Sequence, residues 1–361
     1  MKNLTENKYF NAGLLIFCIY LFLLGIKLVA AAFKIASNHH VIELMNQVSN
    51  PFVGLFIGIL ATSLVQSSSS TTSLTVALVA AGTIQMDLAL YIIMGANIGT
   101  CITNVLVSLS HITRRNEFQY AFAAAIVQNF FNLIAVTLIF PLEYFFGFLS
   151  KTSHSLTAAF KTVGGMHLFK PLDLITKPVV KFITTLLGEN PVIIAIVALV
   201  FLFFALRHMV VVIKRLVMDK LKRIFGAYFF KTYGRAMTSG AIITAVVQSS
   251  SVTTSLAVPF AAARILTVEQ IFPYTIGANI GTTVTTLLAS FSVGSPLGLQ
   301  VALAHTLFNI TGTILITPIK KVPIFMAQKL AYYSVKNRLI PLFYVIIQFF
   351  IIPMLMIYIW R

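Results

Sequence analysis

The chain has 361 residues, of which 58% are apolar and only 10% are charged, and this composition excludes an ordinary soluble domain. The formal charge of +17 would suit a nucleic-acid-binding protein. However, no soluble segment offers a face to nucleic acid, and aromatic residues do not interleave with Lys and Arg in one patch. We therefore assign the positive charge to loops that face the cytoplasm and anionic lipid.

Long apolar segments alternate with polar or basic connections along the chain. About 20 apolar residues cross a bilayer. The first segment, residues 14–35, is long enough to span and has no small-residue cleavage site after it, so we expect it to remain in the protein. Cys18 and Cys101 both lie in apolar segments, so we expect no disulfide. Full spans are predicted at residues 14–35, 88–109, 118–141, 192–213, 271–291, 297–319 and 340–360.

Two further apolar segments are each interrupted by a polar block. They cover residues 51–81 and 237–263, and each half is close to half the length of a full crossing. Non-helical backbone at membrane depth is tolerated only where it is buried in protein or lines a polar cavity. Each segment therefore predicts a broken helix or a re-entrant helical hairpin whose polar block faces a cavity.

The two polar blocks are copies of one sequence. Residues 66–74 read QSSSSTTSL and residues 248–256 read QSSSVTTSL, and each copy is followed by GANIGT, at 95–100 and 277–282. Across residues 66–109, 20 of 44 positions are identical to the residues 182 positions later. This similarity is far above chance for two apolar segments, so the sequence predicts a duplicated fold.

Counting crossings gives the expected topology. Each repeat contains a span, a hairpin and two more spans, which is an odd number of crossings, so the second repeat is inverted relative to the first. We expect a cytoplasmic N-terminus, an external C-terminus and a cytoplasmic loop at Arg114 and Arg115. The Lys-bearing loop at 143–191 then lies outside, although long loops obey the positive-inside rule weakly. The expected divisions are repeat 1 at 1–141, an extracellular loop at 142–190, repeat 2 at 191–319, and a basic amphipathic segment with a final span at 320–361.

The repeated block has a clear chemical character. Its hydroxyl and carboxamide groups offer many hydrogen bonds without fixed charge, and a broken helix adds free backbone N–H groups and a positive helix end. This combination suits a tetrahedral oxyanion, and the same oxygens are hard ligands that can hold sodium. Ser and Thr also serve as packing groups between membrane helices, as does the G-x-x-x-G spacing. Duplication in register favours a binding site over packing alone.

Three kinds of residue near the repeats have alternative interpretations. Asn132 and Asn309 occupy equivalent positions. Either they support the residues that bind the ligands, or they make hydrogen bonds between helices. His305 is disfavoured as a proton carrier because Gln128 takes its place in the other repeat. For Arg264 we favour a helix-end or interfacial anchor over an anion ligand.

These motifs resemble the type II sodium-dependent phosphate cotransporter family. The resemblance rests on the paired QSSS blocks with their GANIGT partners, and also on NPFVGL at 50–55 and FNITG at 308–312, so it covers nearly the whole chain. It implies an all-α polytopic membrane protein with two inverted-topology repeats, each with a re-entrant hairpin. The implied function is import of inorganic phosphate with sodium by alternating access across the cell (inner) membrane, with no cofactor, no enzymatic activity and no nucleic-acid partner.

The resemblance also implies roles for individual residues. The phosphate-binding residues would be Gln66, Ser67, Ser68, Ser69, Gln248, Ser249, Ser250 and Ser251. The sodium-binding residues would be Thr71, Thr72, Ser73, Asn97, Thr100, Thr253, Thr254, Ser255, Asn279 and Thr282, with Asn132 and Asn309 in support. In the loop after Leu109, electrogenic vertebrate members of the family have a sequence like Ala-Gly-Asp, whereas this chain has Ile112-Thr113-Arg114. Because the carboxylate is missing here, the resemblance does not extend to a third sodium or to electrogenic transport.

The sequence is compatible with rival functions. An intramembrane serine hydrolase needs a base beside its Ser, and the two repeats share no carboxylate or His near the motif. A passive anion channel would have the same polar cavity without coupling. Sulfate, arsenate or a small carboxylate could replace phosphate as the substrate, because hydroxyls and helix N-termini do not choose between oxyanions.

Overall fold

A computed structural model describes residues 8–36, 50–162, 170–225 and 229–360, and these residues form helices without β-strands. Seven helical segments of this described part are long and apolar enough to cross a membrane, so the predicted all-α polytopic fold is confirmed. Each of them overlaps one of the seven spans predicted from the sequence. They are Tyr9–Ile35, Met86–Leu109, Arg115–Phe146, Pro191–Val212, Val268–Val293, Pro296–Ile316 and Leu339–Trp360.

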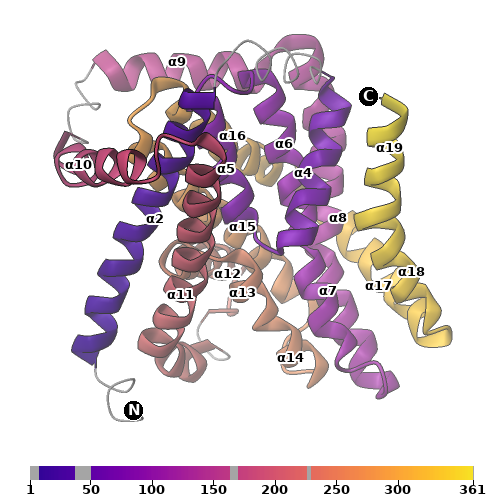
Figure 1. The fold of residues 1–361 in the computed structure, drawn as a ribbon. Coiled ribbons are helices and arrows are strands. Elements are labelled where there is room, and N and C mark those ends of the chain that lie inside the picture. Colours follow the sequence, from indigo (N-terminus) through magenta and orange to yellow (C-terminus); the bar gives the residue numbers. More distant parts are fainter. Residues whose placement is uncertain (1–7, 37–49, 163–169, 226–228, 361) are drawn as a thin grey trace.

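The helices follow one another with short connections (Figure 1). The first group is α2 (Lys8–Ala36), α4 (Pro51–Val65), α5 (Ser68–Ala80), α6 (Met86–Gly99), α7 (Ile102–Leu109) and α8 (Arg115–Phe146). Next come α9 (Phe148–Thr162), α10 (Lys170–Leu186) and α11 (Pro191–Phe225). The last group is α12 (Tyr233–Val247), α13 (Ser250–Ser255), α14 (Ala257–Ala262), α15 (Val268–Val293), α16 (Pro296–Ile316), α17 (Lys321–Lys336), α18 (Leu339–Ile346), η2 (Ile347–Ile351) and α19 (Ile352–Trp360).

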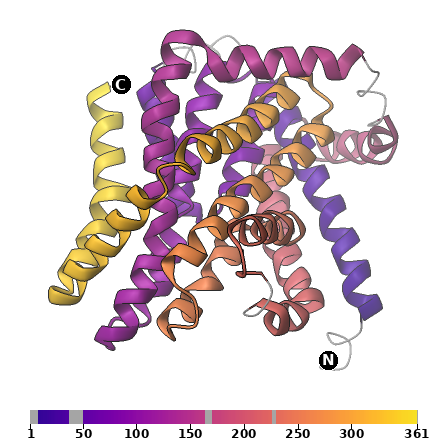
Figure 2. The same cartoon turned by 180° about the vertical axis from the view of Figure 1, so that it is seen from behind.

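The two ends of the described chain lie on opposite sides of the molecule (Figure 1). α2 begins at the lower edge of this view, where the α7–α8 connection also lies, and α19 ends at the upper edge. Seen from behind, α9 crosses the upper side, and the turn between α15 and α16 lies just beneath it (Figure 2). The count of crossings also puts the two ends on opposite sides, and the cytoplasmic placement of the N-terminus stays a prediction.

The segment predicted as a long polar connection, residues 143–191, contains two helices. α9 and α10 have 15 and 17 residues and are amphipathic, so neither resembles a span in the sequence. α10 exposes Leu174, Phe182 and Leu186 on its outer surface. Their regular spacing was the available signal for a helix, and the many Lys, Ser and Thr residues obscured it.

Both interrupted segments form helical hairpins. α4 and α5 lie side by side, and the turn that joins them is near mid-height of the molecule (Figure 1). With 15 and 13 residues, each is too short to cross a bilayer alone. The second segment forms α12 and then α13 with α14, which are joined through Leu256 in helical conformation.

Glycines set how closely each hairpin packs against the following span. A Cβ on Gly95 of α6 would lie 2.0 Å from the Leu55 carbonyl oxygen of α4. At the equivalent place in the second repeat, a Cβ on Gly277 of α15 would lie 1.8 Å from the Met237 carbonyl oxygen of α12. Only glycine permits this backbone contact, which is the close packing expected for small residues in membrane helices. The same contact therefore occurs in both copies.

Candidate functional site

The repeated Gln residues form two turns of the same shape. Gln66 ends α4 with φ 55°, and Gln248 ends α12 with φ 59°, so both have the left-handed conformation. The Gln66 N–H donates to the Thr62 carbonyl and the Gln248 N–H to the Thr244 carbonyl, each at 2.7 Å. The chain thus reverses at the same residue in both copies, as a C-terminal αL cap requires.

The Ser after each Gln caps the next helix. Ser67 has φ −149° and its Oγ accepts from the Ser70 N–H at 3.2 Å. Ser249 has φ −153° and its Oγ accepts from the Val252 N–H at 3.4 Å. A hydroxyl at this position satisfies one of the free N–H groups at the start of a helix. Local sequence chemistry therefore explains why the helix breaks at each QSSS block.

The two turns lie against each other and line one cavity. The Ser69 Oγ donates to the Gln248 carbonyl oxygen at 3.2 Å, which joins the first turn to the second. The cavity has a volume of about 390 Å³, and Arg207 of α11 is the only charged residue among its described lining. Residues from both turns line it together with one face of α11: Val65, Gln66, Ser67, Ser69, Ser70, Gln248, Ser249, Phe203, Leu206, Arg207, Val210 and Val211.

The two Gln side chains differ in their surroundings. Gln66 is exposed to the cavity, whereas Gln248 is buried. The Gln248 Nε2 donates to the Ala245 carbonyl at 2.6 Å, and the Thr285 Oγ1 donates to the Gln248 Oε1 at 2.8 Å. The second turn is therefore held in place by its side chain, while the first carboxamide faces open space.

A pair of equivalent polar triads holds the two repeats together. The Thr72 hydroxyl lies 2.9 Å from that of Thr286, which is 3.0 Å from the His305 Nδ1. In the other copy, the Thr254 Oγ1 lies 2.8 Å from the Asn104 Nδ2, and that Nδ2 also donates to the Gln128 Oε1 at 2.9 Å. In the first triad, Thr72 belongs to repeat 1, whereas Thr286 and His305 belong to repeat 2. In the second triad, Thr254 belongs to repeat 2, whereas Asn104 and Gln128 belong to repeat 1. The two repeats therefore interlock through matching positions.

A chain of amides continues from the second triad. The Gln128 Nε2 donates to the Asn279 Oδ1 at 2.6 Å, and the Asn279 Nδ2 donates to the Asn132 Oδ1 at 2.7 Å. The Asn132 Nδ2 then donates to the Asn97 carbonyl at 2.5 Å. All four side chains are buried, and buried polar groups of this kind are hydrogen-bonded as a rule. Asn132 thus makes interhelical hydrogen bonds in this structure.

Comparison with known proteins gives the family. The sequence profile described as Na+/Pi-cotransporter matches residues 21–169 and 201–328, which is more than half of the chain. The chain belongs to the Na+/Pi-cotransporter family. This is a family of transporters, not of enzymes. No solved structure matches the chain significantly.

Curated relatives in the Na+/Pi-cotransporter family match almost the whole chain. Sodium-dependent phosphate transport protein 2B of Pongo abelii is 30% identical over 440 residues, which cover 94% of this chain and 64% of that protein. The 2A protein of Rattus norvegicus is 30% identical, with 96% and 67% covered, and the 2B protein of Homo sapiens is 30% identical, with 94% and 64% covered. This family member therefore spans 64% to 67% of the length of these relatives.

The remaining sodium-binding candidates differ in their hydrogen bonds, and their role as sodium ligands stays a prediction. Several bond within their own helix, as Ser255 does to the Val252 carbonyl and Thr282 to the Ala278 carbonyl. The Thr100 Oγ1 donates to the Ser68 Oγ at 2.8 Å. The Ser73 Oγ is buried and has no hydrogen-bond partner within the described residues. Its free oxygen is the kind of group that a cation uses.

Three residues flagged from the sequence lie outside the shared cavity. Arg264 lines a different cavity and places its guanidinium 4.7 Å from the centre of the Tyr120 ring, as an anchor would. His305 is buried beside Thr286, and its Nε2 has no partner in the described part of the chain. The Asn309 Nδ2 donates to the His305 carbonyl of its own helix at 3.1 Å.

The repeat comparison missed Arg207, Asn104 and Thr286. Asn104 and Thr286 are equivalent positions with different residues, so a search for identities passes over them. Arg207 has no counterpart among the repeated motifs, so the comparison of the repeats does not reach it. The signal for Arg207 was its place inside the predicted span at 192–213, because an ionisable residue inside a span indicates a functional site.

The second triad makes a prediction about stability. Thr254→Val keeps the shape of the side chain but removes the hydroxyl that bonds Asn104, leaving a buried amide without this partner. We expect a loss of about 1–3 kcal/mol in the free energy of unfolding and a lower melting temperature of the purified protein in detergent. Thr254→Ser keeps the hydroxyl and serves as the control. Equal melting temperatures for the two variants would contradict this role.

Proposed function

We propose that this protein imports inorganic phosphate together with sodium by alternating access. The observation that carries the proposal is that both QSSS turns line one cavity with Arg207. Membership of the Na+/Pi-cotransporter family and relatives named sodium-dependent phosphate transport proteins support the substrate and the coupling ion. The protein would act in the cell (inner) membrane with its N-terminus in the cytoplasm.

The cavity offers complementary groups for a phosphate ion. Arg207 supplies a charged fork of N–H donors, and this geometry matches two phosphate oxygens. The turns add the carboxamide of Gln66 and the hydroxyls of Ser67 and Ser69 as neutral donors. In the proposed assignment, the remaining Ser residues of each block support these groups.

Sodium would be held by uncharged oxygens near the turns. One Arg does not neutralise a phosphate that carries up to two negative charges, so a bound cation makes phosphate binding more favourable. The Ser73 hydroxyl, which has no partner among the described residues, and its neighbours in the Thr-rich helices provide such oxygens. Sodium binding and phosphate binding would thereby favour each other, which is the basis of coupling.

Alternating access requires two arrangements of the repeats. The Thr72–Thr286 and Thr254–Asn104 contacts join one repeat to the other close to the turns. Relative movement of the two repeats would break and remake such contacts while the turns stay around the ion. The hairpins, which pack tightly on their own spans through glycine, would move as units.

Two rival functions have less support from the geometry. A serine hydrolase needs a base near its Ser, yet the only charged group in the described lining of the cavity is Arg207, which is not a base. A passive channel needs no duplicated, interlocked repeats. Sulfate and arsenate share the shape of phosphate, so they are competitors to test.

The experiment is uptake of radiolabelled phosphate into proteoliposomes under an inward sodium gradient or an equal potassium gradient. Accumulation above equilibrium with sodium alone is the expected result. Equal flux in both salts would indicate a channel and contradict the proposal. Excess sulfate or arsenate added outside identifies the preferred oxyanion, and stronger inhibition by sulfate than by unlabelled phosphate would contradict phosphate as the substrate.

A further inference from the structure

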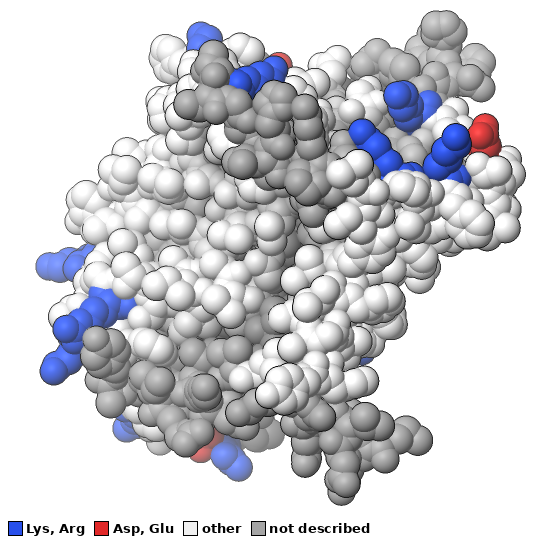
Figure 3. Space-filling view, turned by 90° about the vertical axis from the view of Figure 1, so that its left-hand side faces the viewer, with Lys and Arg blue, Asp and Glu red and all other residues white. Residues whose placement is uncertain are grey.

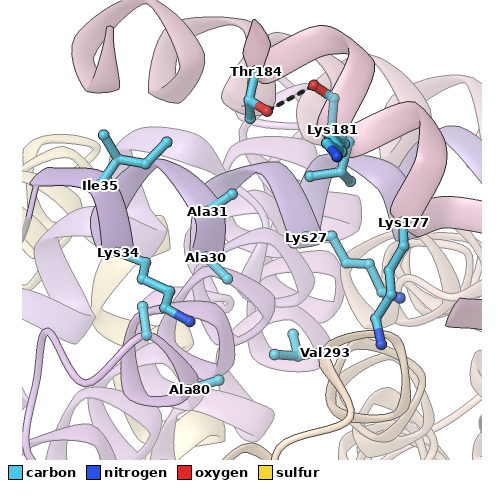
Figure 4. A pocket seen from close by; sticks show the side chains of 12 residues that line it. Lys27, Ala30, Ala31, Lys34, Ile35, Ala80, Lys177, Lys181, Thr184 and Val293 are labelled. Atoms are coloured by element: carbon cyan, nitrogen blue, oxygen red, sulfur yellow. Dashed lines mark hydrogen bonds between the residues drawn. The ribbon is translucent and has the colours of Figure 1, made fainter. Parts of the chain in front are cut away.

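A second cavity lies at the other side of the molecule from the start of α2. It has a volume of about 590 Å³ and is formed mainly between the end of α2 and α10. Four lysines line it, and the close-up view shows them around the hollow (Figure 4). None of its described lining residues is a carboxylate. The four residues are Lys27, Lys34, Lys177 and Lys181.

The spacing of these lysines places them on facing sides of two helices. Lys27 and Lys34 are seven residues apart on α2, and Lys177 and Lys181 are four residues apart on α10, so each pair shares one helical face. The Lys27 Nζ donates to the Thr176 Oγ1 at 2.6 Å, which ties α2 to α10. Both faces contribute charge of one sign to the same hollow.

Four ammonium groups around one cavity favour an anion in it. Like charges repel, and a concave surface with low-dielectric walls concentrates their field. Viewed from the side that carries α10, basic side chains gather on the upper part of the surface, with acidic surface at the edge of the group (Figure 3). The Thr184 side chain also lines the cavity and adds a hydroxyl to the charged groups.

The position of α10 indicates where the anion comes from. Its outer surface exposes Leu174, Ile175, Phe182 and Leu186 by 78%, 58%, 65% and 69%. An amphipathic helix of this kind lies in the interface of a bilayer, with its apolar side toward the acyl chains and its lysines at the level of the headgroups. Lysines at this depth meet the phosphates of lipids and the anions of the adjoining solution.

We propose that Lys27, Lys34, Lys177 and Lys181 form a second anion site that binds a phosphate group. The group belongs either to an anionic phospholipid or to inorganic phosphate in solution, since both present the same charged oxygens. The site is separate from the cavity between the QSSS turns, because the two have no lining residue in common. It does not depend on the transport proposed above.

The test is binding to the purified, delipidated protein in potassium buffer, which excludes sodium-linked binding between the turns. The variant is Lys177→Gln/Lys181→Gln, and the matched control is Lys151→Gln/Lys161→Gln, which removes two exposed lysines of α9. Bound phosphatidylglycerol is counted by native mass spectrometry against phosphatidylcholine. Inorganic phosphate is tested separately by the shift in melting temperature.

We expect the wild-type protein and the α9 control to bind one of the two anions at least about tenfold more tightly than the α10 variant. Tighter binding of phosphatidylglycerol alone identifies a lipid site, and a phosphate-dependent shift in melting temperature identifies a site for the free ion. Unfolded variant protein is detected by circular dichroism, and Lys34→Gln then replaces the double variant. Equal binding by variant and control, or no binding of either anion by the wild type, would overturn the proposal.

Discussion

Arg207→Gln is expected to lower sodium-driven phosphate uptake by at least about 100-fold. Arg207 is the only charged residue in the described lining of the cavity that both QSSS turns share. A charge-assisted hydrogen bond contributes about 1.5–3 kcal/mol, and two of them from one guanidinium exceed the roughly 2.7 kcal/mol that corresponds to 100-fold. Initial rates in proteoliposomes under an inward sodium gradient measure this effect.

Two further variants separate charge from geometry. Arg207→Lys keeps the charge but loses the planar pair of donors, so we expect an intermediate rate. Arg235→Gln removes an exposed arginine near the start of α12 and should leave the rate within about twofold, since Arg235 does not line the cavity. If the Arg207→Gln protein transported phosphate as fast as the Arg235→Gln protein, the positive charge of Arg207 would not be used in transport.

Gly277→Ala is expected to prevent stable folding of the second hairpin. The added Cβ would lie 1.8 Å from the Met237 carbonyl oxygen, and this contact is backbone, so no side chain can turn away to relieve it. Overpacking of a tight interface typically costs 1–3 kcal/mol, and we expect at least about 3 kcal/mol here because two helix backbones must separate. Thermal unfolding in detergent, followed by size-exclusion chromatography, measures the loss.

The control for this prediction lies in the partner helix of the same pair. Gly234 is in α12, and a Cβ added there has no neighbouring atom within 4 Å. Gly234→Ala should leave the melting temperature unchanged or raise it slightly, because Ala favours a helix over Gly. If Gly277→Ala and Gly234→Ala melted at the same temperature, the close packing of α12 on α15 would not be needed for stability.

Duplication is the reason that so much of the fold is predictable from the sequence. Spans follow from apolar length, and the QSSS blocks divide two further segments into halves that are each too short to cross. The G-x-x-x-G spacing of the two GANIGT blocks is a helix-packing pattern, and the structure gives Gly95 and Gly277 each a partner on the preceding hairpin. The amphipathic helices α9 and α10 were hidden because a short helix with many polar residues resembles a loop.

The contacts that connect the repeats were not predictable in the same way. Thr254 meets Asn104, which is 150 residues distant, and Thr72 meets Thr286, which is 214 residues distant. Such pairs depend on how the repeats pack, and nothing in the local sequence indicates them. Likewise, the hydrogen bond that Asn132 makes between helices is identified only by its partner in space, Asn279. The proposed roles of individual residues in binding phosphate or sodium remain predictions.

The most direct test of the account is the number of sodium-dependent phosphate ions bound per chain. Equilibrium binding of radiolabelled phosphate to purified protein is measured in sodium buffer, and the binding in potassium buffer is subtracted. The proteins compared are the wild type, Gln66→Gly and Gln248→Gly. Glycine adopts the left-handed conformation of these turns, so each variant removes a carboxamide without straining the backbone. In the second turn the variant also removes the contacts to Ala245 and Thr285 that hold the turn in place. We predict one phosphate per wild-type chain, and at least tenfold weaker binding to that one site in both variants. Two phosphates per chain, with each variant losing one and keeping the other at unchanged affinity, would contradict a single site built from both turns.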